Sequence, residues 1–148
     1  FLFGDGKTLG GSAMYKNILV PVLFDEEHDN QKSYQVARAL ADDDAKFTVA
    51  HVVEAIPNFV RLEMPTDVLE ARHDKIKQML DNAAKGLPGA VPELISGHAA
   101  KAILNYADEN EIDCIVLASH QPGFEDLLLG STASRVVRHA KCAVHVVR

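Results

Sequence analysis

The residues whose types and spacing most directly suggest chemistry are Gly130, Ser131 and Thr132, near the end of this chain of 148 residues. They stand directly before a short amphipathic segment, so a glycine and two hydroxyl groups gather where a helix is expected to begin. The first N–H groups of a helix have no partners within the helix, and the helix dipole favours negative charge at that end. This arrangement predicts an anion site, with phosphate as the natural guest. A plain helix start is the alternative interpretation, because Ser is a common N-cap residue.

An apolar run and a polar loop lead up to that glycine. Residues 114–118 form a short, continuous apolar run with β-branched side chains, which is typical of a buried strand. Ser119 and His120 follow at its end, and His120 is interpreted either as a phosphate contact or as a polar loop side chain. Neighbouring side chains at a strand end usually point in opposite directions, and the sequence has no G-x-S-x-G elbow. We therefore expect no catalytic Ser–His pair.

Other residues that could bind a metal have spacings that do not favour it. The seven histidines are scattered, without a HExxH motif or a paired-ligand spacing, so no metal site is expected. The three aspartates at 42–44 are interpreted as a solvated turn after a helix, because carboxylates oppose the dipole at that end. His51 and His145 lie among valines in predicted strands and are interpreted as core or interface side chains.

The composition, with 47% hydrophobic and 24% charged residues, indicates an ordinary globular protein with room for one domain. A net charge of -6 argues against nucleic acid or an anionic membrane as the main partner, since both attract basic patches. No apolar run approaches the roughly 20 residues that span a bilayer, so a soluble protein is expected. Cys114 and Cys142 are interpreted as reduced core residues, which suits a cytoplasmic location. Residues 1–13 are interpreted as a vector-derived or foreign leader, and residues 14–148 as a single domain.

The elements that must position these residues alternate along the chain. Continuous apolar runs predict five strands, at residues 17–22, 47–53, 91–95, 114–118 and 143–147. Helical periodicity predicts four helices between them, which begin near Asn30, Thr66, Gly97 and Thr132, and the connection 55–65 is expected to be a loop. This order predicts an α/β fold with a doubly wound, five-stranded parallel sheet and helices on both faces. Ligands bind such sheets outside the carboxyl ends of the strands, where the strand order reverses, and the first and fourth strands are expected to flank that point.

Two of the helices have apolar stripes that are expected to face the core. The stripe of the first helix comprises Val36, Ala37, Leu40 and Ala41. The stripe of the longest helix, with Thr66 as its expected N-cap, comprises Leu69, Ile76, Met79, Leu80, Ala83 and Leu87.

Several segments together resemble the universal stress protein family. They are the early run ILVPV, the pair His51-Val52, the pair Ser96-Gly97, and the final segment IVLASHQPGFEDLLLGSTASRVVRHAKCAVHVVR. The resemblance implies a sheet of order 3-2-1-4-5, a homodimer formed through the last strands, and bound ATP without rapid turnover.

Two positions depart from the pattern of the family's nucleotide-binding branch, which carries a Gly-x2-Gly-x9-Gly-(Ser/Thr) signature. Gly130 and Ser131 match the end of that signature, but Ala118 and Gln121 stand where its first two glycines are expected, as in an ASHxP-type subgroup. The family often has an Asp directly after the first strand; this chain has Leu23 there, and Asp25 two residues later is the candidate replacement.

The resemblance also implies roles for individual residues. Pro21 and Val22 would flank an adenine ring, with Asp25 nearby, and backbone groups around Val52 would bind the edge of the ring. Ser119, His120 and Gln121 would wrap the phosphates, beside Ala118, which is small enough for close approach of the backbone. Gly130, Ser131 and Thr132 would contact the phosphates or a bound Mg²⁺ ion. The expected ligand is ATP, or else AMP or ADP.

The resulting hypothesis is a regulatory protein of the stress response whose nucleotide occupancy modulates a dimer or partner surface. The alternative is a stress-response interaction dimer that binds no nucleotide. A slow ATPase is a third possibility, for which Asp25 and His120 are the available general bases. The identity of a protein partner does not follow from the sequence.

Overall fold

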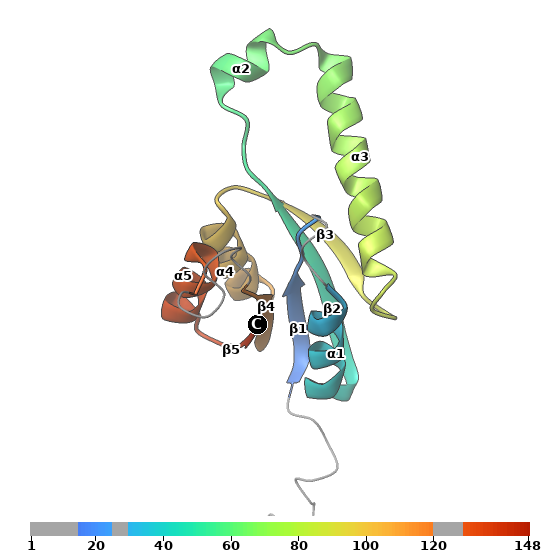
Figure 1. The fold of residues 1–148 in the computed structure, drawn as a ribbon, viewed down its shortest axis with the longest axis vertical. Helices are drawn as coiled ribbons and strands as arrows, with labels where there is room; N and C mark the ends of the chain where they lie inside the picture. Colours follow the sequence, from blue (N-terminus) through green and yellow to red (C-terminus); the bar gives the residue numbers. More distant parts are fainter. Residues whose placement is uncertain (1–14, 25–29, 120–128) are drawn as a thin grey trace, which may run out of the picture.

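The computed structural model describes residues 15–24, 30–119 and 129–148. Its five strands form one parallel sheet in the order β3-β2-β1-β4-β5, which confirms the predicted α/β fold and strand order (Figure 1). The strands are β1 (Tyr15–Pro21), β2 (Ala41–Val53), β3 (Val91–Ser96), β4 (Cys114–Ala118) and β5 (Ala143–Val147). The helices are α1 (Asn30–Leu40), α2 (Asn58–Glu63), α3 (Thr66–Ala84), α4 (Ala99–Glu109) and α5 (Ser131–His139). As predicted, β1 and β4 are adjacent at the point where the order reverses.

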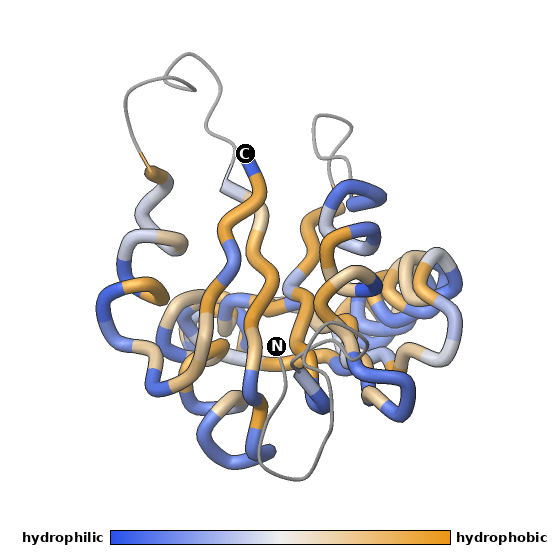
Figure 2. Tube along the Cα trace, turned by 90° about the horizontal axis from the view of Figure 1, so that it is seen from below, coloured by the Kyte–Doolittle hydropathy of each residue, from blue (hydrophilic) through white to orange (hydrophobic). Residues whose placement is uncertain are grey.

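Each face of the sheet is covered by two helices. Successive side chains of a strand point to opposite faces, so each apolar strand contributes to the core on both sides. Ile18 and Val20 of β1 belong to a cluster with α1 and α3, whereas Leu19 between them belongs to a cluster with α4 and α5. The apolar strands therefore run through the middle of the molecule, with hydrophilic turns around them (Figure 2).

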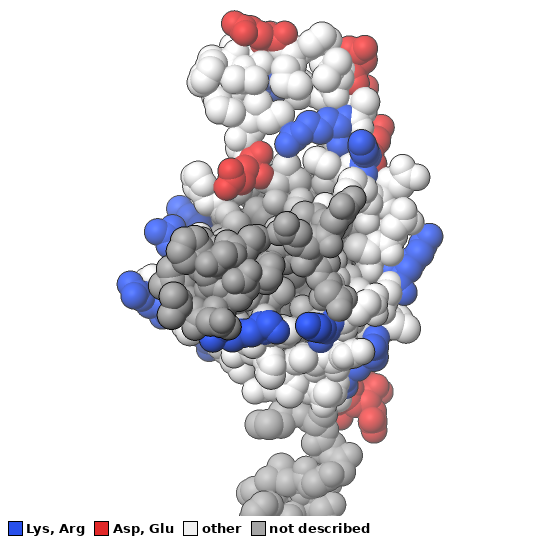
Figure 3. All heavy atoms as spheres, in the orientation of Figure 1, with Lys and Arg blue, Asp and Glu red and all other residues white. Residues whose placement is uncertain are grey.

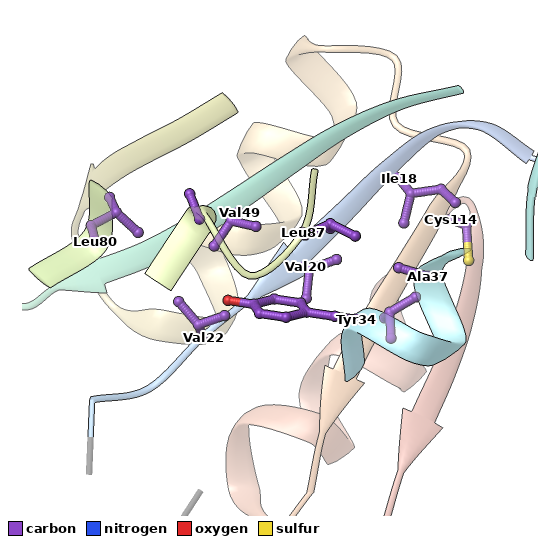
Figure 4. Close-up of a cluster of buried hydrophobic side chains, with 11 residues drawn as sticks. Ile18, Val20, Val22, Tyr34, Ala37, Val49, Leu80, Leu87 and Cys114 are labelled. Atoms are coloured by element: carbon purple, nitrogen blue, oxygen red, sulfur yellow. The ribbon is translucent and has the colours of Figure 1, made fainter. Parts of the chain in front are cut away.

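Tyr34 of α1 is the largest fully buried side chain and was not part of the predicted stripe. It points into the first cluster beside Val20 and Val22 (Figure 4), and its hydroxyl donates a hydrogen bond of 2.8 Å to the Ala83 carbonyl of α3. Ser33, Tyr34 and Ala37 are the buried residues of α1, whereas Val36 and Leu40 are only half-buried. The helix is thus rotated slightly from the predicted orientation.

The connection between β2 and α3 is not the predicted loop, because it contains the six-residue helix α2. The N-cap of α3 is Pro65 rather than Thr66, and no side chain caps the helix. Figure 1 shows α2 and the first half of α3 extending beyond the end of the sheet. As a result, the predicted stripe of α3 packs on the core only near the end of the helix, where Leu80 is fully buried and Leu69 is not.

The aspartates at 42–44 lie in β2, so the prediction of a turn is wrong. The pairing of β1 with β2 shifts between Tyr15, opposite Ala41, and Asn17, opposite Lys46. The aspartates fall in this irregularity, where extra residues bulge out of the ladder. Asp43 and Asp44 are exposed, so they are solvated as expected, but on a strand.

The predicted leader 1–13 lies outside the described residues. No helix in the described part of the chain combines the length and apolar character needed to cross a membrane. Cys114 and Cys142 are both free thiols, as predicted; Cys114 is buried and Cys142 half-buried.

Candidate functional site

A hollow of about 110 Å³ lies at the carboxyl end of the sheet, where β1 and β4 separate. This is the place where doubly wound sheets bind ligands, because the loops after the two strands leave in opposite directions. The residues that line the hollow are Pro21, Val22, Leu23, Asn30, Val52, Ala99, Ile103, Leu117, Ala118 and Thr132. Most of them are apolar, so the hollow suits a flat ring better than a charged group.

The turn after β1 forms one wall of the hollow and is held by hydrogen bonds. The Val22 N–H donates to the Ala50 carbonyl at 2.8 Å, which extends the ladder one residue past the end of β1. The Leu23 carbonyl accepts a hydrogen bond of 3.2 Å from Asn30 Nδ2, at the start of α1. Leu23 itself, which stands where the resemblance implied an aspartate, is 48% exposed.

The backbone of Val52 faces the same hollow. In a parallel ladder, alternate residues direct both their N–H and C=O toward the same neighbouring strand. Ala50 directs its carbonyl toward Val22, so Val52 directs its N–H and C=O to that side as well, at a level where β1 has ended. Within the described residues, the Val52 N–H donates to no residue of the turn after β1.

The start of α5 closes the opposite side of the hollow. Gly130 is the N-cap of α5, and no side chain caps the helix. The Gly130 N–H donates a hydrogen bond of 3.2 Å to Ser119 Oγ, which ties the start of α5 to the end of β4. Ser119 is itself held to β5, because its N–H donates to the Val147 carbonyl at 2.8 Å.

A polar depression of about 370 Å³ adjoins the hollow and shares Ala99 and Thr132 with it. Two helices start here, α4 after His98 and α5 after Gly130. Its lining comprises Glu54, His98, Ala99, Ala100, Ser131, Thr132 and Arg135. Positive ends of two helix dipoles, a guanidinium and an imidazole therefore surround a space that suits an anion, with one carboxylate at its edge.

The structure brings most of the sequence-predicted site residues together. The predicted residues that line the hollow are Pro21, Val22, Val52, Ala118 and Thr132. Ser131 lines the depression, and Ser119 and Gly130 join the two sides by their hydrogen bond. Asp25, His120 and Gln121 lie outside the described residues.

Sequence reasoning missed the contribution of α4, from which Ala99 and Ile103 reach the hollow and His98 reaches the depression. The only available signal was Gly97, which marks the turn that brings the start of α4 to the carboxyl edge of the sheet. Gly97 adopts φ +134°, a conformation that L side chains rarely adopt. Among the described residues, no three His, Cys, Asp or Glu side chains are grouped to hold a metal ion.

A doubly wound sheet with a hollow at its reversal point defines an α/β protein of the class whose ligand sites lie at the carboxyl ends of the strands. Residues 14–148 match the profile of the Universal stress protein family. The chain therefore belongs to the universal stress protein family.

Individual relatives align with this chain over nearly their whole length. Universal stress protein G of Escherichia coli O157:H7 is 28% identical over 145 residues, which cover 91% of this chain and 100% of that protein. Among solved structures, universal stress protein UspA from Lactobacillus plantarum is 29% identical, with a TM-score of 0.67 over 92% of this chain and 99% of that one. The hypothetical protein MJ0577 is 22% identical, with a TM-score of 0.74 over 91% and 96%.

Three further solved structures of the family contain adenine nucleotides. One universal stress protein is in complex with cAMP, with 21% identity and a TM-score of 0.65 over 90% of this chain and 97% of that one. The protein from Archaeoglobus fulgidus is in complex with dAMP, with 21% identity and a TM-score of 0.56 over 90% and 98%. A protein from Arabidopsis thaliana has AMP bound, with 17% identity and a TM-score of 0.58 over 89% and 90%. At these identities the likeness shows the shared fold alone.

Proposed function

We propose that this protein binds an adenine nucleotide at the hollow between β1 and β4. The observation that carries the proposal is that three features lie next to one another. They are an apolar hollow, the N–H and C=O groups of Val52 that face it, and the uncapped start of α5. The adenine edge presents a donor beside an acceptor, which one N–H and one C=O of the same residue can match. Relatives with bound AMP, cAMP and dAMP support the same class of ligand.

The size of the hollow sets the orientation of the ligand. About 110 Å³ is well below the roughly 300–1,000 Å³ of pockets that enclose a drug-sized molecule, so only the base fits inside. The ribose and phosphates would extend past Thr132 into the polar depression, toward Ser131 and Arg135. The helix start and the guanidinium there offset the phosphate charge, which a protein of net charge -6 would otherwise repel.

ATP with Mg²⁺ is the specific ligand we propose. The depression has room for more than one phosphate, and Arg135 lies one turn into α5, beyond the N–H groups that would hold the first. The phosphate oxygens would hold Mg²⁺, with the hydroxyls of Ser131 and Thr132 as the nearest protein ligands. Mg²⁺ keeps several waters and needs few protein ligands, which fits a site without a carboxylate cluster among the described residues.

The proposed role is regulation in the stress response, in a cytoplasmic homodimer. Strand β5 is an edge strand that pairs only with β4 among the described strands. Its outer edge therefore has hydrogen-bonding groups available to a second copy of the chain. Ser119 lies beside the site and bonds to Val147 of β5, which gives nucleotide occupancy a direct route to that edge. The two free thiols suit the reducing cytoplasm.

An interaction dimer without nucleotide is the second candidate. Leu23 favours it, because an exposed apolar side chain at the mouth of the hollow offers a ribose hydroxyl no hydrogen bond.

Two measurements separate the candidates. The purified protein is denatured and the released small molecules are identified; the protein is also titrated calorimetrically with AMP and with ATP, with and without Mg²⁺. Release of an adenine nucleotide, or saturable binding that is absent with ribose 5-phosphate, supports the nucleotide proposal. No release and no heat of binding with any of these ligands would reject it in favour of the interaction dimer.

A further inference from the structure

His51 lies near the end of β2 on the sheet face covered by α1 and α3. Side chains alternate along a strand, so His51 shares the face of Val49, in the cluster with α1 and α3, whereas Val52 shares the face of Ala50. The imidazole packs on the Phe24 ring with centroids 4.2 Å apart and planes inclined by 36°. His51 therefore does not line the hollow, and any effect on a ligand must pass through other residues.

The ring of His51 holds the carbonyl of Val22. The distance between His51 Nδ1 and the Val22 oxygen is 2.9 Å. A carbonyl oxygen only accepts, so Nδ1 carries the proton and donates. In a ladder that continued past β1, this carbonyl would instead accept the N–H of Val52, two residues beyond Ala50.

The β1–β2 ladder stops at this contact. The Val22 N–H is still part of the ladder, through Ala50, but the Val22 carbonyl is turned toward the imidazole. This leaves the N–H of Val52 without its ladder partner, on the side that faces the hollow.

We propose that His51 is a positioning residue for ligand binding: it diverts the Val22 carbonyl and so keeps the backbone pair of Val52 available to the ligand's base. The Phe24 ring packed on His51 and the bond from Asn30 to the Leu23 carbonyl hold the two residues after Val22 in the diverted course. This inference rests on the proposed function for its ligand, but the state of the Val52 amide can be measured without one.

The test compares three variants. His51→Phe keeps a ring against Phe24 and removes the donor; His51→Asn places an N–H near the position of Nδ1 and removes the ring. His73→Phe is the matched control, because His73 is exposed on α3, outside both the hollow and the depression. Each is measured by amide hydrogen exchange without ligand and by calorimetric titration with AMP.

In His51→Phe the released Val22 carbonyl is expected to accept the Val52 N–H, so exchange at the Val52 amide slows and AMP binding weakens by about three- to tenfold. A general loss of stability would make that amide exchange faster instead. His51→Asn is expected to restore both values to within about threefold of wild type, and His73→Phe to leave both unchanged.

Unchanged or faster Val52 exchange in a folded His51→Phe protein would overturn the inference. If the wild-type protein bound no AMP, the proposed function would fail by itself, and the Val52 exchange rates would still decide whether His51 controls this ladder.

Discussion

At the scale of single residues, Gly130 is informative because the fold does not require a glycine there. Its φ is -55°, which every residue type adopts, and among the described residues an added Cβ would meet only Ser119 Oγ, at an ordinary 3.8 Å. Its conformational freedom is therefore not needed. Gly is a favourable N-cap residue, and its small size would also let the proposed ligand approach the start of α5 closely.

The first prediction concerns this residue. Gly130→Val is expected to abolish AMP binding while costing only about 1 kcal/mol of unfolding free energy, since Gly is a better N-cap residue than Val. Gly130→Ala, with one methyl group, is the graded control and is expected to bind more weakly than wild type. Calorimetry and urea unfolding measure the two effects; full affinity in folded Gly130→Val would show that the ligand does not approach this helix start.

Cys114 makes a second prediction, on pH dependence. Burial, with smaller contributions from Cys142 and Asp113, raises the pKa of its thiol from 9.0 to about 11. The folded state thus holds the proton more tightly than the unfolded state, so the stabilisation is present below pH 9 and is lost as the pH rises toward 11. Tyr34 and Tyr106, whose pKa values burial also raises, act in the same direction.

Urea unfolding between pH 8 and 11 separates the thiol from the tyrosines. The unfolding free energy of wild type is expected to fall more steeply with pH than that of Cys114→Ala, because the variant lacks one of the groups whose pKa burial raises and retains Cys142, Tyr34 and Tyr106. Equal slopes would show that the thiol does not contribute.

At the scale of elements, α1 and α3 meet at one close contact. A Cβ on Gly86, just after α3, would lie 2.8 Å from Tyr34 Cε2 and 2.9 Å from Gln31 Nε2. The tyrosine ring is locked in the core and its hydroxyl is bonded to Ala83, so it cannot move aside. A side chain at position 86 must push the two helices apart.

Gly86→Ala is therefore expected to destabilise the protein by about 1–3 kcal/mol. In a Tyr34→Leu background most of that cost should vanish, because the obstructing ring is gone; the double-mutant cycle gives the coupling. Additive effects in that cycle would show that Tyr34 does not restrict position 86.

The end of α3 that packs on the core and the neighbouring helix α2 are expected to tolerate substitution differently. Leu80 is 1% exposed, whereas Leu62, on the neighbouring α2, is 85% exposed. Leu80→Ala should cost about 2–5 kcal/mol, and Leu62→Ala no more than about 0.5 kcal/mol. Urea unfolding measures both; a large loss from Leu62→Ala would mean that α2 packs against the body.

The elements also differ in how well their sequence patterns predict them. The five apolar runs predicted the strands because continuous hydrophobic segments suit a sheet covered on both faces. Helix α2, which lies between Pro57 and Pro65, was missed because its six residues are too few for a periodic pattern. The exposure of the first half of α3 could not be predicted, because periodicity gives the apolar face of a helix but not whether the sheet extends beneath it.

The candidate site was predictable in the same uneven way. Pro21, Val22, Ala118 and Thr132 could be predicted because each stands at the end of a strand or the start of a helix in a parallel sheet, whereas Val52 was implied by the resemblance to the family. The contributions of α4 and the diversion of the Val22 carbonyl depend on how a helix crosses the sheet and on a hydrogen bond between distant residues. Neither leaves a local pattern in the sequence.

At the scale of the whole molecule, the sheet order sets the location of the candidate site, and the charge distribution bears on the proposed ligand. On the face shown in Figure 3, Lys and Arg side chains are scattered over the body and the arm formed by α2 and α3, and acidic residues lie on that arm and at the lower end of the body. An anionic ligand would therefore be attracted by local groups, such as Arg135 and the two helix starts, rather than by a general positive field.

The central claim is that the base of an adenine nucleotide binds to the backbone of Val52. It is tested most directly at the Val52 amide, because a bound base would give the N–H of this residue a new acceptor in the wild-type protein. An NMR titration with AMP is expected to shift the Val52 amide strongly and saturably, with smaller shifts at Ala118 and Thr132, whereas ribose 5-phosphate leaves Val52 in place. Binding of AMP with an unperturbed Val52 amide, or no binding at millimolar AMP, would contradict the account.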